Sequence, residues 1–250
     1  MNNYTDINAA TIDRWIESGN IFWSKPISHE TYLAAVRGAW PFPDIPKEWF
    51  PPLKGKKVLG LASGGGQQMP VFAAYGADCT LLDYSKKQLD SDRLVAEREG
   101  YRMELVQADM AKRFPFENET FDVIFHPVCN IYIEDVYHIW NECSRVLKHG
   151  GVLIASLTHE TYYLFDDTDT EPLTVRQTLP WNPLKNATAE ELQRMVDNDE
   201  GLEFSHSITE NIGGQLKAGF ILTELFESRA ADSVLGKYMP QNYHTRAYKP

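Results

Sequence analysis

The sequence predicts an α/β protein built on a mostly parallel sheet, and two observations carry this prediction. Short apolar runs alternate with longer amphipathic stretches between residues 57 and 157, which is the pattern of strands joined by helical crossovers. The first apolar run, 58–61, leads into three consecutive glycines, 64–66. Glycines in a turn between a buried strand and a helix let the backbone bend sharply and approach a ligand closely. We therefore expect a ligand site at the carboxyl edge of the sheet.

The remaining elements follow from periodicity and end signals along the chain. Strands are expected at 58–61, 79–82, 103–106, 121–125, 152–157 and 220–226, with a short last one near 243–248. Helices are expected at 67–75, 85–99, 134–148 and 207–217. Ser85 and Gln88 have the spacing of a capping box, and Gly150-Gly151 should break the third of these helices.

The two segments that flank this alternation look different from it. Residues 7–18 and 28–36 read as helices, and a proline-rich connector follows them. Residues 158–202 are acidic and irregular, which predicts an insertion over the ligand edge. Both segments are rich in aromatics, among them Trp15, Trp23, Trp40, Trp49 and Trp181. These aromatics either pack the segments onto the domain or form a lid that encloses a ligand.

Composition and charge exclude several function classes. The 250 residues include 24 basic and 35 acidic side chains, for a net charge of −11, and such a surface repels nucleic acid backbones. Three cysteines without Cys-x-x-Cys spacing predict neither disulfides nor a metal site and favour the cytoplasm. No stretch resembles a signal peptide or a membrane span. We expect no nucleic acid, metal or membrane partner, and the oligomeric state stays open.

Two aspartates end neighbouring predicted strands and point to an adenosine site. Asp83 closes the second strand, and its carboxylate can accept hydrogen bonds from both hydroxyls of a ribose. Asp109 closes the third strand, where it can accept the exocyclic amine of an adenine. A dinucleotide site would need a third glycine where Met69 stands, which disfavours a nicotinamide-dependent oxidoreductase.

In their order and spacing, these residues resemble the class I S-adenosylmethionine-dependent methyltransferases of the small-molecule type. The similarity rests on five motifs, at 58–66, 82–89, 107–110, 114–125 and 145–153. It implies a Rossmann-like sheet of seven strands, mostly parallel, with helices on both faces and an antiparallel last strand. We therefore divide the chain into an N-terminal helical cap, 1–53, and a domain that binds S-adenosylmethionine, 54–250, with a lid insertion at 158–202.

The resemblance also implies which residues contact the cofactor. The turn would lie against its methionine part, Asp83 would hold the ribose, and Tyr84 and Gln88 would flank the adenosine. Asp109 and Met110 would hold the adenine edge. The implied cofactor residues are Ala62, Ser63, Gly64, Gly65, Gly66, Gln68, Asp83, Tyr84, Gln88, Asp109, Met110 and His126. The family usually has an acidic residue where Gly60 stands and a glycine where Ala62 stands.

On the acceptor side, the resemblance implies in-line methyl transfer to a small molecule. His126 is the candidate general base, although a histidine whose side chain simply packs is the competing interpretation. Trp23, Asn130 and Tyr132 are candidate acceptor contacts. The segment 126–129, His-Pro-Val-Cys, replaces the Asn/Asp-Pro-Pro-Tyr signature of the nucleobase-methylating members and argues against DNA as acceptor. A non-catalytic module that binds S-adenosylmethionine remains open beside the oxidoreductase.

Overall fold

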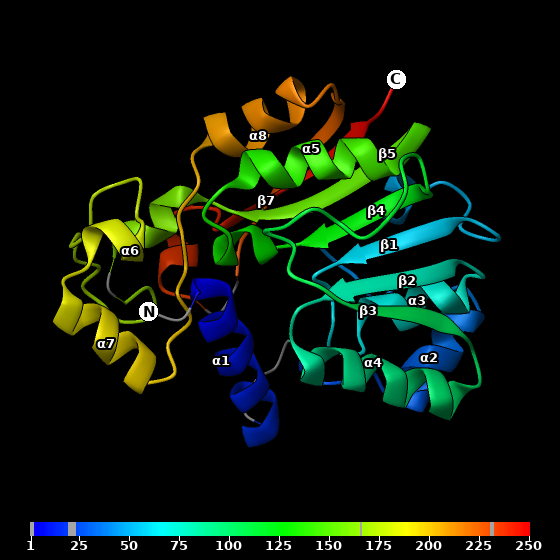
Figure 1. The fold of residues 1–250 in the computed structure, drawn as a ribbon, viewed down its shortest axis with the longest axis horizontal. Helices are drawn as coiled ribbons and strands as arrows, with labels where there is room; N and C mark the ends of the chain where they lie inside the picture. The colour runs from blue at the N-terminus through cyan, green and yellow to red at the C-terminus, as the bar shows by residue number, and fades with distance from the viewer. Residues whose placement is uncertain (1–2, 20–23, 166, 231–232) are drawn as a thin grey trace.

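The computed structural model describes residues 3–19, 24–165, 167–230 and 233–250, so Trp23 lies outside the described residues. Within them, one sheet has the strand order β3-β2-β1-β4-β5-β7-β6 (Figure 1). The strands are β1 (Lys57–Leu61), β2 (Asp78–Asp83), β3 (Met103–Gln107), β4 (Phe121–Pro127), β5 (Leu147–Thr158), β6 (Ile221–Ser228) and β7 (Asn242–Tyr248). β7 is antiparallel to both β5 and β6, and the pairs from β3 to β5 are parallel. The predicted Rossmann-like sheet with an antiparallel last strand is confirmed.

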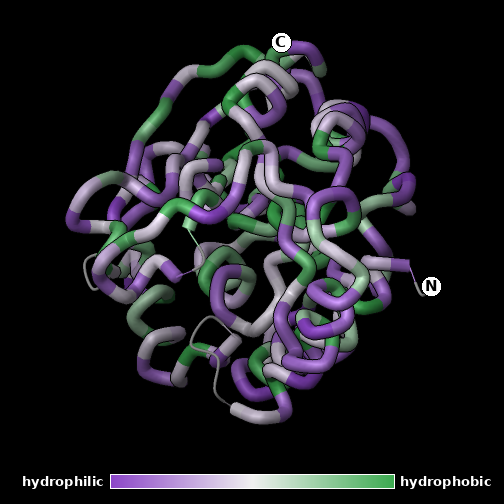
Figure 2. Tube along the Cα trace, turned by 90° about the vertical axis from the view of Figure 1, so that its left-hand side faces the viewer, coloured by the Kyte–Doolittle hydropathy of each residue, from purple (hydrophilic) through white to green (hydrophobic). Residues whose placement is uncertain are grey.

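The central strands are apolar throughout because both faces of the sheet are covered. Alternate residues of one strand enter two different cores: Val58 packs on one side and Leu59 on the other, and Phe125 and Ile124 do the same in β4. Hydrophobic stretches of the trace run through the middle of the molecule, with hydrophilic turns mostly around it (Figure 2). This double burial explains why the strands lack a polar alternation.

Helices lie on both faces of the sheet. α5 and α8 contact each other on one face, and α2, α3 and α4 contact one another on the other (Figure 1). The helices are α1 (Tyr4–Ser18), α2 (His29–Val36), α3 (Gln68–Ala74), α4 (Lys86–Glu99), α5 (Val136–Val146), α6 (Pro183–Asn186), α7 (Ala189–Asp197) and α8 (Ile208–Lys217). None of the described helices is both long and apolar enough to cross a membrane.

Both ends of the helix predicted at 134–148 are wrong, because α5 spans Val136–Val146. Asp135 caps α5 by accepting the N–H groups of Tyr137 and His138, and the helix stops at Val146. Leu147 already pairs with Phe121, so the two glycines predicted to break the helix lie inside β5. The register shift between Phe121 and Val123 accommodates them.

The predicted capping box at the start of α4 is only half formed. The Ser85 hydroxyl accepts the N–H of Gln88, as expected. The Ser85 N–H, however, is taken by Asp83, and the side-chain oxygen of Gln88 has no hydrogen-bond partner among the described residues. The carboxylate that ends β2 has therefore displaced the glutamine from its usual place in the box.

The two flanking segments pack on different parts of the domain and do not form the lid as a whole. α1 lies across the carboxyl ends of the parallel strands (Figure 1). Trp40, Trp49 and Phe50 pack with Phe72 of α3 on the far side of the sheet, so this part of the predicted lid is wrong and the packing interpretation holds there. The insertion is less irregular than expected, because Thr188 starts α7 with a complete capping box.

Candidate functional site

A cavity of about 320 Å³ lies at the carboxyl edge of the sheet, between the strand ends and α1. Among the predicted cofactor residues, those that line it are Ala62, Gln68, Asp83, Tyr84, Gln88, Asp109 and Met110. Parallel strands end at one edge, so residues far apart in the sequence converge there. The structure therefore brings the adenosine candidates together.

Asp83 forms part of the cavity wall and is 7% exposed. One carboxylate oxygen accepts the N–H of Ser85 at 2.9 Å, and the other accepts the N–H of Gly64 at 3.1 Å. Burial raises the pKa of Asp83 to about 6, and these N–H groups oppose that rise. Each oxygen has a second acceptor position, so the carboxylate can still receive two hydroxyl groups from the cavity.

The glycine turn supports this carboxylate from below. A Cβ on Gly64 would lie 2.5 Å from the Gln88 Cβ and 2.8 Å from an Asp83 oxygen, so no larger residue fits without displacing both. Ser63, Gly64, Gly65 and Gly66 are buried and do not line the cavity. Only Ala62 reaches it, with φ of 50°. The turn thus positions the side chains of the cavity wall, and among its own residues only Ala62 is part of that wall.

Asp109 lies two residues beyond the end of β3, where Gln107 pairs with Asp83. One of its oxygens accepts the Ala111 N–H at 2.9 Å, and the other accepts the Thr5 hydroxyl of α1 at 2.9 Å. Met110 lines the cavity beside it and is 7% exposed. The predicted adenine edge is therefore in contact with the N-terminal helix.

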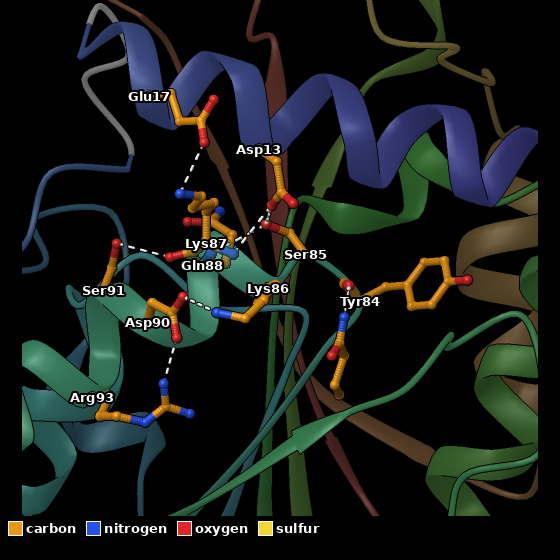
Figure 3. A network of polar contacts seen from close by, with 11 residues as sticks. Asp13, Glu17, Tyr84, Ser85, Lys86, Lys87, Gln88, Asp90, Ser91 and Arg93 are labelled. Atoms are coloured by element: carbon orange, nitrogen blue, oxygen red, sulfur yellow. Dashed lines mark hydrogen bonds and ion pairs between the residues drawn. The ribbon is translucent and has the colours of Figure 1, made fainter.

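A row of polar contacts fastens α1 to the start of α4, and we call it the α1–α4 clasp (Figure 3). Asp13 accepts the Ser85 hydroxyl at 2.5 Å and the Lys87 N–H at 3.1 Å. Glu17 pairs with the Lys87 ammonium at 2.8 Å, and Asp6 accepts the Tyr84 hydroxyl. The clasp closes the cavity on the adenosine side.

Sequence reasoning missed the contribution of α1 to the lining, which comes from Thr5, Asn8, Ala9 and Ile12. A signal was present, because Asp6, Asp13 and Glu17 recur at i, i+7 and i+11 on one helix face. An acidic stripe on one face of this helix suggests polar partners on the domain, although it does not say which.

His126 and Asn130 lie beneath the cavity wall rather than on it. His126 is 0% exposed, and its ring nitrogens contact the Leu61 carbonyl and the Asn130 side-chain oxygen. Burial lowers the pKa of His126. Asn130 also donates to Asn211 at 2.9 Å. The packing interpretation of His126 fits this geometry better than a general base, because neither nitrogen faces the cavity.

The segment after β4 supplies the other wall, which is mostly apolar. Val128, Cys129, Ile131, Tyr132 and Ile133 line it. Burial raises the pKa of the Cys129 thiol far above its usual range, so this sulfur is a poor nucleophile. Among the described lining residues the charged ones are Asp83 and Asp109, and no group of described residues could hold a metal ion.

Comparison with known proteins decides the family. A model described as "Methyltransferase domain" matches residues 59–155. YbaJ of Bacillus subtilis, described as an uncharacterized methyltransferase, is 41% identical over 257 residues, covering 100% of both chains. The chain belongs to the class I S-adenosylmethionine-dependent methyltransferases. The resemblance seen in the sequence motifs is confirmed, and the oxidoreductase alternative is wrong.

Two solved structures share the fold of this methyltransferase, and a more distant relative matches half of its sequence. An S-adenosylmethionine-dependent methyltransferase from Mesorhizobium loti has a TM-score of 0.63 at 19% identity, covering 85% of this chain and 99% of that one. A geranyl diphosphate C-methyltransferase from Streptomyces coelicolor has a TM-score of 0.55 at 14% identity, covering 79% and 72%. A ubiquinone biosynthesis O-methyltransferase from Vibrio atlanticus is 29% identical over 123 residues, 48% of this chain and 52% of that one.

The residues of the cavity fit S-adenosylmethionine, the cofactor of this family. The carboxylates of Asp83 and Asp109 match the hydrogen-bond donors of a ribose and an adenine. The buried side-chain oxygen of Gln88 has no partner among the described residues, although Gln88 lines the cavity. A ligand N–H or O–H would satisfy this oxygen, which otherwise carries a desolvation cost.

Proposed function

We propose that this methyltransferase transfers the methyl group of S-adenosylmethionine to a small molecule bound in the same cavity. One observation carries the proposal: the cavity joins a polar wall, with Asp83 and Asp109, to an apolar wall that includes Ile131 and Tyr132. The polar wall suits the cofactor and the apolar wall suits an acceptor. Both lie under α1, which encloses them.

The residues hold these partners as follows. Asp83 receives the ribose hydroxyls, Gln88 and Tyr84 flank the adenosine, and Asp109 with Met110 holds the adenine edge. The bound cofactor supplies an electrophilic methyl group on sulfur. The chain aligns the acceptor with that methyl group and excludes water, and alignment of this kind is worth about 7–11 kcal/mol in intramolecular models.

The acceptor wall also argues against a nucleic acid acceptor. Proteins that bind nucleic acids present basic side chains to the phosphates. The described lining residues include neither lysine nor arginine, and the chain carries a net charge of −11. A small acceptor without phosphate groups is the better match to this surface.

Calorimetry with S-adenosylhomocysteine, the demethylated product, tests the cofactor assignment. We expect Asp83→Ala to weaken binding at least tenfold, because a hydrogen bond to a charged group contributes about 1.5–3 kcal/mol. Asp78→Ala is the matched control, since Asp78 is exposed at the opposite end of the same strand. Equal affinities of the wild type and Asp83→Ala would contradict the assignment.

A second measurement addresses the acceptor. Methyl-labelled S-adenosylmethionine is incubated with the protein and with a cell extract split into macromolecules and small molecules. We expect label in the small-molecule fraction. Label recovered only in nucleic acid or protein would contradict a small acceptor, and cofactor binding without transfer to either fraction would favour the non-catalytic alternative.

A further inference from the structure

Behind the apolar wall, two tyrosines converge on one carboxylate. Tyr132 lines the cavity, and its phenol interacts with the side chain of Glu203. Tyr163, which is 8% exposed, donates its hydroxyl to Glu203 Oε2 at 2.9 Å. The carboxylate itself is not among the lining residues. Tyr132 therefore stands between the cavity and a partner that can take a proton from it.

The segment 201–204 fixes the position of this carboxylate. On one side of Glu203, the Leu202 backbone is held by the Asn8 side chain of α1 through bonds of 2.8 and 3.0 Å. On the other side, the Phe204 N–H donates to the Ile131 carbonyl at 2.6 Å. Leu202 is 0% exposed and Phe204 1%. Since both neighbours are anchored and buried, Glu203 has little freedom to turn away from Tyr132.

The close approach of this segment to Tyr132 depends on a glycine. A Cβ on Gly201 would lie 3.1 Å from ring carbons of both Trp15 and Tyr132. The lack of a side chain at Gly201 thus lets the segment 201–204 pack directly against Tyr132. This packing links the acceptor wall, the insertion and α1 in one rigid contact.

The pKa shifts of Tyr132, Tyr163 and Glu203 indicate which of them can accept a proton from a ligand. Burial raises the pKa of Tyr132 and Tyr163 well above the usual value, so both phenols stay neutral. Burial also raises the pKa of Glu203, while the two phenols oppose that rise. Tyr162 and Cys129 are the other titratable groups that interact with Tyr132. A carboxylate with raised proton affinity beside a neutral phenol is a suitable base.

We propose that Tyr132 and Glu203 form a proton relay for an acceptor that carries a neutral phenolic hydroxyl. The proposal rests on the proposed function and names its acceptor class. As the acceptor oxygen bonds to the methyl carbon, the carbon–sulfur bond breaks and its electron pair remains on sulfur. The acceptor proton passes to the Tyr132 oxygen while the Tyr132 proton passes to Glu203, and it leaves to solvent afterwards. Tyr132 is the catalytic residue, and Glu203 is a positioning residue that acts through it.

The neutral character of the acceptor follows from the same wall. No described lining residue is a lysine, an arginine or a histidine, so a carboxylate or phosphate on the acceptor would lose its hydration without gaining a cation. A phenol, by contrast, presents an apolar ring to Ile131 and Ile133 and a single hydroxyl to Tyr132. The phenol then has to lose one proton during methyl transfer, and Tyr132 with Glu203 can take up one proton.

The acceptor class is tested with matched phenols. Methyl 4-hydroxybenzoate and its carboxylate, 4-hydroxybenzoate, are offered with methyl-labelled S-adenosylmethionine. We expect transfer to the ester and at least tenfold less to the carboxylate. Equal transfer to both, or none to either by protein that binds S-adenosylhomocysteine, would overturn the acceptor class. Failure to bind S-adenosylhomocysteine would instead contradict the proposed function.

The relay is tested by replacing solvent protons with deuterium. Because the acceptor proton moves while the methyl group is transferred, single turnovers of methyl 4-hydroxybenzoate should be slower in deuterium oxide. Glu203→Gln and Tyr132→Phe should lower kcat for this phenol by about 10²–10⁴-fold, while the affinity for S-adenosylhomocysteine changes less than tenfold. Single turnovers that deuterium leaves unchanged would overturn the relay, and so would an equal loss of S-adenosylhomocysteine affinity, which would show a structural role. If Glu203→Gln does not fold, Tyr132→Phe provides the same comparison.

Two further measurements separate the relay from general damage. Tyr163→Phe removes one donor to Glu203 but leaves the relay intact, so kcat should fall less than tenfold. Infrared difference spectra of the S-adenosylhomocysteine complex report protonation without turnover. As pH falls, the wild type should show a protonated carboxyl signal that Glu203→Gln lacks, and this signal should appear at a pH above the ordinary pKa of glutamate. Identical spectra for the wild type and Glu203→Gln would contradict Glu203 as the proton acceptor.

Discussion

Replacing Asp92 with asparagine tests the electrostatics beneath the glycine turn. Asp92 is 0% exposed and accepts the Gly66 N–H at 2.8 Å through one oxygen, while its other oxygen has no partner among the described residues. Burial raises the pKa of Asp92 from 3.8 to about 8, and the neighbouring Asp83 adds to this. An asparagine keeps the acceptor for Gly66 and removes the charge.

The sign and size of the effect follow from proton linkage. Between the unfolded pKa of 3.8 and the folded value of about 8, the folded state binds one more proton than the unfolded state. The free energy of unfolding therefore falls as pH rises, by up to about 1.4 kcal/mol per pH unit. Asp92→Asn lacks this loss. We expect it to be more stable than the wild type by up to about 5 kcal/mol near pH 7.5, and nearly equal to it close to pH 4.

Denaturant unfolding of both proteins across this pH range measures the difference directly. Asp90→Asn is the control on the same helix, because Asp90 pairs with Lys86 and Arg93 at the surface (Figure 3). Those partners lower the pKa of Asp90, so its replacement should change stability by less than about 1 kcal/mol, in the destabilising direction. An Asp92→Asn protein no more stable than the wild type at neutral pH would refute the reasoning.

Three further predictions concern α1, the turn and the surface. Asp13→Ala removes the acceptor of Ser85 and Lys87, so amide exchange in α1 should become faster; unchanged exchange by mass spectrometry would show that the clasp does not hold the helix. Ala62→Gly should raise the free energy of unfolding by about 0.5–1 kcal/mol, because it relieves a left-handed alanine, whereas Ala34→Gly in α2 should lower it by about 1 kcal/mol. A mobility-shift assay at low salt should show no binding to DNA or RNA, and a salt-sensitive micromolar complex would contradict this.

The sheet and its polar edge were predictable because their signals are local. Each strand is a short apolar run; Asp83 directly follows one such run, and Asp109 follows another within three residues. Parallel strands that end at one edge bring these residues together whatever the loops do. The ends of α5 were less predictable, since pairing of Leu147 with Phe121 overrode the helical pattern before the two glycines.

The orientation of His126 depends on the strand pleat rather than on its position. Alternate residues of β4 face opposite sides of the sheet, and His126 shares the side of Ile124, beneath Trp140 of α5. Because His126 lies next to the last residue of β4, its side chain was expected near the cavity. The alternation of side chains along the strand instead directs its ring into the core. The sequence already predicted an apolar face on the helix that becomes α5. Placing His126 on the side of the sheet that this face covers would have favoured the packing interpretation.

The acceptor side escaped prediction because it is assembled from distant segments. Asn8 and Leu202 are 194 positions apart, and Tyr163 and Glu203 are 40 apart. None of these residues belongs to a motif, and no periodicity relates them. Contacts of this kind appear only after the chain has folded, so the sequence indicated an insertion over the edge but not which of its residues meet Tyr132.

The departure from the family pattern at Gly60 is physically connected to Met69. A Cβ on Gly60 would lie 2.4 Å from both the Met69 sulfur and the Ser63 hydroxyl. An acidic residue at this position would therefore collide with the methionine that stands where a dinucleotide fold has its third glycine. Met69 is 0% exposed and packs in the core with Phe72, so it fills the space that an acidic side chain would enter. Gly60 and Met69 thus act as one substitution, in which a carboxylate under the turn is exchanged for apolar packing. The charge of the cavity then rests on Asp83 and Asp109, both at the polar wall.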